Sequence, residues 1–135
     1  MPFATEDQFI DAAEAKLGVR LPKALRARLR NTNGGEVEIK DDVWQLYPVF
    51  DTSDRKRTTR TANDIVRETT VAREWRGFPP AAVAIAANGS GDLLVLLPSA
   101  QDPSILDERI YVWDHETTKL HVVAGNLEQV ANGEG

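Results

Sequence analysis

Two apolar runs separated by a five-residue polar turn constrain the fold of this chain most strongly. The first run covers residues 79–87, the second covers residues 93–98, and the turn between them is Asn88-Gly89-Ser90-Gly91-Asp92. Each run is far shorter than the ~18 apolar residues that a transmembrane helix requires. A strand that is apolar on both faces is covered on both sides, so we expect this pair to form the buried centre of a β-sheet.

Two further turn signatures lie on either side of this one in the chain. Leu21-Pro22 opens a basic segment that ends at Asn33-Gly34-Gly35, and Tyr111-Val112-Trp113-Asp114-His115-Glu116 runs from a strand into a turn. Proline fixes φ where a helix begins, and glycine accepts the positive φ needed after a helix or within a hairpin. The sequence therefore predicts structural roles for these signatures, with positive φ at Gly34 or Gly35 and at Gly89 or Gly91.

Hydrophobic spacing predicts the remaining elements. Apolar residues three or four apart indicate helices over residues 6–17, 22–33 and 65–75. Thr5-Glu6-Asp7-Gln8 is typical of a capping box at the start of the first helix, and Asn126-Leu127-Glu128-Gln129 caps a short last helix. Alternating apolar residues indicate hairpins over residues 37–48 and 110–123. Residues 51–60 contain no apolar side chain, so we expect a solvated, mobile loop there.

The order of these elements predicts the fold class. Strands that follow one another as hairpins, without a crossover helix between each pair, form an antiparallel sheet. We therefore expect one α+β layered domain over residues 1–135, mainly an antiparallel sheet with helices packed on one face.

Charge is distributed unevenly along the chain. The net charge is −5, and residues 88–135 alone carry 2 basic and 8 acidic side chains. Lys and Arg contacts to phosphate supply most non-specific nucleic-acid affinity, so this acidic third argues against direct binding of nucleic acid. It favours a basic protein partner, although excess carboxylates also serve solubility alone. A basic segment, residues 55–60, leaves open the alternative that the partner protein is acidic.

Few residues offer catalytic or cofactor chemistry. The chain has no cysteine, which excludes disulfides and thiolate metal sites. The only histidines, His115 and His121, lie near Asp114 and Glu116, but adjacent strand residues point to opposite faces, so we do not expect Asp114 and His115 to converge on a metal. Ser90 lies outside any Gly-x-Ser-x-Gly motif. We therefore expect no catalytic residue, no metal and no cofactor.

Acidic residues at the predicted turns are the candidate partner-binding residues. Side chains at turns reach solvent and attract a basic partner over long range without prior burial. The candidates are Asp92, Asp107, Glu108, Asp114 and Glu116.

Taken together and in this order, the three signatures resemble the SUKH superfamily, the Smi/Knr-like domain, over most of the chain. The resemblance implies binding to a protein partner rather than catalysis. Bacterial members are largely immunity proteins, which implies stoichiometric neutralisation of a cognate polymorphic toxin, for example a basic nuclease. The alternative is a regulatory or scaffold module, as in fungal Smi/Knr-like proteins of cell-wall signalling. The chain starts without a signal-peptide pattern, so we expect a cytoplasmic protein that does not bind membranes.

Overall fold

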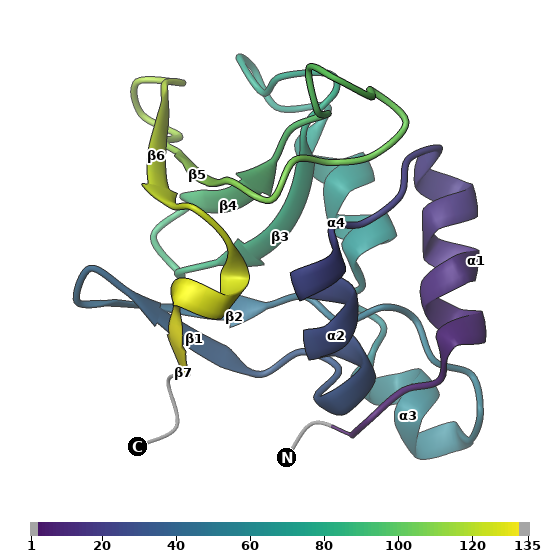
Figure 1. The fold of residues 1–135 in the computed structure, drawn as a ribbon. Coiled ribbons are helices and arrows are strands. Elements are labelled where there is room, and N and C mark those ends of the chain that lie inside the picture. The colour runs from purple at the N-terminus through teal and green to yellow at the C-terminus, as the bar shows by residue number, and fades with distance from the viewer. Residues whose placement is uncertain (1–2, 133–135) are drawn as a thin grey trace.

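All strands of the computed structural model, which describes residues 3–132, belong to one curled antiparallel sheet (Figure 1). The strand order is β6-β5-β4-β3-β2-β1-β7. The strands are β1 (Glu36–Ile39), β2 (Asp42–Leu46), β3 (Val83–Ala87), β4 (Leu93–Leu96), β5 (Ile110–Trp113), β6 (Leu120–Ala124) and β7 (Ala131–Asn132). Because β6 and β7 are the outermost strands, the sheet ends in one strand of five residues and one of two.

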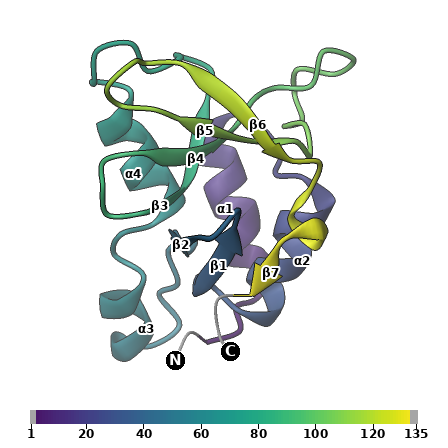
Figure 2. The ribbon, with the colours of Figure 1, turned by 90° about the vertical axis from the view of Figure 1, so that its left-hand side faces the viewer.

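The α-helices gather on one side of this sheet, as the two orthogonal views show, and a short 3₁₀ helix connects β6 to β7 (Figures 1 and 2). The helices are α1 (Asp7–Leu17), α2 (Lys23–Asn31), α3 (Arg55–Arg60), α4 (Ile65–Ala72) and the 3₁₀ helix η1 (Leu127–Gln129). This arrangement confirms the α+β fold with a mainly antiparallel sheet. Among residues 3–132, no helix combines the length and the apolar character that crossing a bilayer demands.

The central pair of strands is buried as the sequence predicted. All four residues of β4 and the first four of β3 are buried. The register of the two strands shifts between Ala84 and Ala86, next to the residue that contacts helix α4. The Thr69 hydroxyl accepts a hydrogen bond from the Ala84 amide at 2.9 Å, which fastens α4 to the sheet without an unsatisfied amide.

Glycine supplies the backbone conformations that the signatures require. Gly34 and Gly35 have φ of 112° and 86°, and Gly89 and Gly91 have φ of 85° and 100°. These values confirm the predicted positive φ. In the first signature Asn33 adds a tertiary role, because its side-chain amide donates to the Val49 carbonyl at 2.9 Å and accepts from the Val49 amide at 2.8 Å.

Residues 51–60 contain a helix where a loop was expected. The Asp54 carboxylate accepts a hydrogen bond from the Arg57 amide at 2.7 Å and so caps α3. Arg57 also lies over the Phe3 ring, with its guanidinium carbon 4.3 Å from the ring centroid. Since α3 buries none of its own residues, it leaves no apolar stripe in the sequence by which a helix is usually recognised.

Two helix ends also differ from the sequence prediction. Helix α4 ends at Ala72, and Trp75, which was expected to lie in it, follows in a turn and is 41% exposed. Helix α1 begins at Asp7 without a side-chain cap, because the Thr5 hydroxyl donates to the buried Asp51 carboxylate at 2.7 Å instead. Tertiary contacts therefore displace the local capping pattern at the N-terminus.

Candidate functional site

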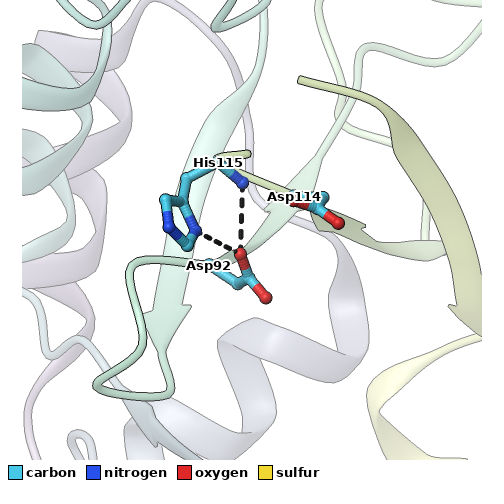
Figure 3. Close-up of side chains that lie close together, drawn as sticks. All are labelled: Asp92, Asp114 and His115. Atoms are coloured by element: carbon cyan, nitrogen blue, oxygen red, sulfur yellow. Dashed lines mark hydrogen bonds and ion pairs between the residues drawn. The ribbon is translucent and has the colours of Figure 1, made fainter. Parts of the chain in front are cut away.

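The second and third signatures meet at one end of the β4–β5–β6 sheet region (Figure 3). The Asp92 carboxylate accepts a hydrogen bond from the His115 backbone amide at 3.1 Å and lies 2.7 Å from Nδ1 of the His115 ring. This contact with Asp92 raises the pKa of His115 above its ordinary value. The pair therefore joins the turn before β4 to the turn after β5.

Asp114 forms the turn itself. Its carboxylate accepts hydrogen bonds from the backbone amides of Glu116 at 2.8 Å and Thr117 at 3.2 Å. These bonds from Thr117 and Glu116 hold the pKa of Asp114 below its usual range. Such a carboxylate stabilises the turn because it satisfies two amides that have no strand partner.

Glycine permits the close approach of the two signatures. A Cβ on Gly91 would lie 3.0 Å from the His115 ring nitrogen, and Gly91 has a φ of 100°. On the other side of the hairpin, the Trp113 indole donates to the Gly77 carbonyl at 3.3 Å. The third signature is thus held by Gly91 on one side and by the segment after α4 on the other.

The side chains of Asp92, Asp114 and His115 converge, which corrects the expectation for Asp114 and His115. One potential ligand atom from each residue lies within 4.8 Å of the others. The strand rule does not apply here because β5 ends at Trp113 and both residues belong to the turn. Their atoms already serve other contacts: Asp92 holds His115, and Asp114 holds two amides. These three side chains therefore join the turn before β4 to the turn after β5.

The five candidate partner-binding residues form two groups at opposite ends of β5. Asp92, Asp114 and Glu116 lie at the end where Leu93 pairs with Trp113. Asp107 and Glu108 precede Ile110, at the end where β5 pairs with Ala124 of β6. Glu116 is exposed and the other four are partly exposed. Their role in binding stays a prediction.

These five residues differ in how much structure depends on them. Asp92 and Asp114 accept hydrogen bonds from backbone amides of the turns. Asp107 forms an ion pair with Arg109, in which the carboxylate Oδ2 lies 3.7 Å from the guanidinium Nε. Within residues 3–132, the side chains of Glu108 and Glu116 enter no hydrogen bond or ion pair. Glu108 and Glu116 are therefore the carboxylates most free to act on a partner.

The exposure of strand β6 was not predicted from the sequence. His121 and Val122 are exposed, and Val122, at 50%, is more exposed than any other large hydrophobic residue in the described part of the chain. Strand order decides whether a strand is an edge, and one strand's own residues do not reveal that order. The available signal was weak: a short uncharged stretch, Leu120–Ala124, inside an acidic region.

The large aromatic residues near the third signature and in β2 differ in burial. Trp44 and Trp113 are buried at 3% and 2% exposure. Trp113 stacks against Trp75 with ring centroids 5.9 Å apart and contacts Phe78 edge-on at 5.3 Å. Trp75 alone among these four rings is substantially exposed.

Comparison with known proteins gives one result that places the chain in a family. No curated protein matches the sequence. The family model described as SMI1 / KNR4 family (SUKH-1) matches residues 4–133, nearly the whole chain. The chain therefore belongs to the SMI1/KNR4 family, SUKH-1.

Proposed function

We propose that this protein is an immunity protein, which neutralises a toxic protein by binding it one to one. The observation that carries the proposal is the family match over residues 4–133, since a SUKH domain is compatible with this role. Neutralisation of this kind needs no reaction. The bound protein covers the active site or the substrate channel of the toxin, and tight binding alone keeps that site closed.

The surface of the molecule is large enough for such an interface. Residues 3–132 lie in a fold that exposes 7479 Å², whereas a standard interface takes about 800 Å² from each partner. The β5–β6 hairpin, which exposes His121 and Val122 of β6 and has acidic residues at both ends, fits within such an area. Acidic groups on this face complement a toxin whose substrate channel is basic, as in a nuclease that holds phosphates.

Co-expression with the product of the adjacent gene tests the proposal. We expect that product to arrest growth when expressed alone, and we expect growth to recover when this protein is present. Purified together, the two chains should form a 1:1 complex, and inhibition of the toxin should be complete only at equimolar ratio.

Two outcomes would contradict the proposal. Protection at a small fraction of the toxin concentration would indicate catalysis rather than binding. A complex with a host regulatory protein, without any protection from a neighbouring toxin, would instead favour a regulatory or scaffold module of the Smi/Knr type.

A further inference from the structure

Strand β6 presents an unpaired sheet edge. It is the first strand in the order β6-β5-β4-β3-β2-β1-β7, and among residues 3–132 it pairs with β5 alone. In an antiparallel pair, alternate residues direct their amide and carbonyl groups away from the partner strand. The outward groups of β6 are therefore a template on which a further strand can pair.

The sequence of β6 lacks several of the devices that usually protect an edge, although Lys119 directly precedes the strand. Natural edges carry Lys, Pro or inward-pointing charge, whereas β6 reads Leu-His-Val-Val-Ala. A second protective feature is present, since Tyr111 pairs with Val122 while Ile110 pairs with Ala124, which leaves Val123 as an extra residue. This irregularity restricts regular pairing to Leu120–Val122, the stretch that includes the most exposed valine.

Space for an added strand continues past the irregularity. A hollow of about 380 Å³ separates the end of β6 from the tip of the β1–β2 hairpin. Val123 and Ala124 line one side of it, and Ile39 and Lys40 line the other. An extended segment paired along β6 would therefore continue into this hollow, where the described residues do not block it.

Charge at the two ends of the hairpin selects the occupant. Asp114 and Glu116 flank β6 at its first residue, and Asp107 and Glu108 flank it at its last, because Ala124 pairs with Ile110. Each end also carries one basic residue, Lys119 at the first and Arg109 at the last, so acidic side chains outnumber basic ones at both ends. A second copy of this chain, added antiparallel along β6, would bring the acidic residues at one end against those at the other. Like charges brought together in this way repel, so pairing between two copies of the chain is disfavoured.

We infer that β6 is a docking edge for an extended segment of the partner protein, with apolar residues alternating along it and basic residues at its ends. The inference rests on the proposed function, because it specifies how the partner is held. Main-chain hydrogen bonds to β6 supply affinity, and the acidic groups at the hairpin ends fix the position of the segment.

A synthetic peptide tests the docking edge without the toxin. The probe is Lys-Thr-Val-Thr-Val-Thr-Lys, added to the full ¹⁵N-labelled chain and followed by amide chemical shifts and hydrogen exchange. We expect changes centred on residues 120–124. A control peptide that is N-methylated at every position between the lysines should cause none, because it cannot pair by its backbone.

Matched variants separate edge pairing from charge. Val122→Lys should weaken peptide binding about ten-fold, since a lysine on the edge disfavours an added strand. Val71→Lys adds the same charge at a residue that is 40% exposed on helix α4, where no edge exists, and should leave binding unchanged. Val122→Thr should also retain binding, because threonine keeps the β propensity.

Several results would overturn the inference: unaltered β6 amides at saturating peptide, equal binding of the N-methylated peptide, or equal loss in the two lysine variants. Sedimentation that shows a dimer lost in Val122→Lys would replace the partner segment by a second copy. Since the peptide assay contains no toxin, its failure leaves the immunity role standing. If the peptide binds β6 but the protein gives no protection from the toxin, the immunity role is contradicted and the docking edge at β6 is not.

Discussion

Single residues in the turns set how closely the signatures pack. Gly77 has a φ of 81°, and a Cβ there would lie 2.5 Å from Cγ2 of Thr118. Thr118 itself has a φ of 60°, so both residues occupy the left-handed region where the two segments touch. Gly89 has a similar φ of 85°, but a Cβ added to Gly89 would meet no other atom within 4 Å. Alanine at position 89 therefore introduces backbone strain alone, whereas alanine at position 77 introduces backbone strain and a steric clash.

We expect Gly89→Ala to lower the free energy of unfolding by about 1 kcal/mol, from backbone strain alone. Gly77→Ala should cost clearly more, because the added methyl group also displaces Thr118. Urea denaturation measures both values. In a Thr118→Gly background, the excess cost of Gly77→Ala should disappear. If the excess persists in that background, contact with Thr118 is not its cause.

Asp51 is a buried carboxylate that connects three segments. It accepts hydrogen bonds from the Thr5 hydroxyl at 2.7 Å and the Ser53 amide at 2.9 Å, while its own amide donates to Thr61 Oγ1 at 2.9 Å. Burial acts to raise the pKa of Asp51, but the hydrogen bonds from Ser53 and Thr5 and the charge of Arg57 outweigh it and lower that pKa. The ionised form is therefore the one that the fold stabilises.

The pH dependence of stability follows from this lowered pKa. Asp51 stabilises the fold fully above the pKa of the unfolded carboxyl, about 4, and this contribution is lost as pH falls through the lower pKa of the folded state. Asp51→Asn should cost about 2 kcal/mol at neutral pH. The difference from the wild type in denaturant titrations should shrink as the solution is acidified. A difference that stays constant with pH would contradict the role of the charge.

At the level of elements, α3 should be the least stable helix. It buries none of its residues, whereas α4 buries Ile65, Thr69 and Ala72. Asp54→Ala removes the cap of α3, worth roughly 1 kcal/mol, and should speed amide exchange of Arg57 about five-fold without altering β3 and β4. Hydrogen exchange read by NMR measures this effect.

The matched control removes the cap of the neighbouring helix. The Asp64 carboxylate accepts from the Arg67 amide at 3.0 Å at the start of α4. Because α4 is packed on the sheet, Asp64→Ala should lower the stability of the whole protein. Equal, purely local effects of both substitutions would show that α4 is no better anchored than α3.

Elements with a strong apolar pattern were predictable from the sequence. The strands on either side of residues 88–92 have apolar residues on both faces, and both are buried in the structure. Helix α3 was not predictable in this way, because its support is a cap and the stacking of Arg57 on Phe3, a contact between residues distant in sequence. Where capping and tertiary contact replace an apolar stripe, periodicity gives no signal.

The candidate site was predictable only as a list of residues. Turn chemistry indicated that the acidic residues would reach solvent, but not that Asp92 would meet His115 across 23 positions of sequence. Nor did the sequence indicate that the five carboxylates would separate into two groups, since that depends on the pairing of β5 with β4 and β6. Register and strand order, which are properties of the whole sheet, decide both.

At the scale of the whole molecule, we expect an acidic face to attract a basic partner over long range. This face consists of Asp92, Asp107, Glu108, Asp114 and Glu116. Reversal of Asp92 or Asp114 would disturb the turns that these residues hold. Glu108→Lys with Glu116→Lys avoids that problem, because neither side chain is bonded within the described residues. The matched control is Glu6→Lys with Glu74→Lys, the same charge change at exposed positions on the helix side of the chain.

Association kinetics with the product of the adjacent gene test the central claim most directly. Stopped-flow mixing at about 0.05 M and about 0.5 M salt compares two degrees of charge screening. We expect the Glu108→Lys, Glu116→Lys variant to associate several-fold more slowly than the wild type at low salt, and the difference to vanish at high salt. The control pair should match the wild type, and both variants should keep the wild-type melting temperature to within a few degrees. An association rate that is the same in all three proteins, and insensitive to salt, would contradict the claim that this acidic face draws the partner in.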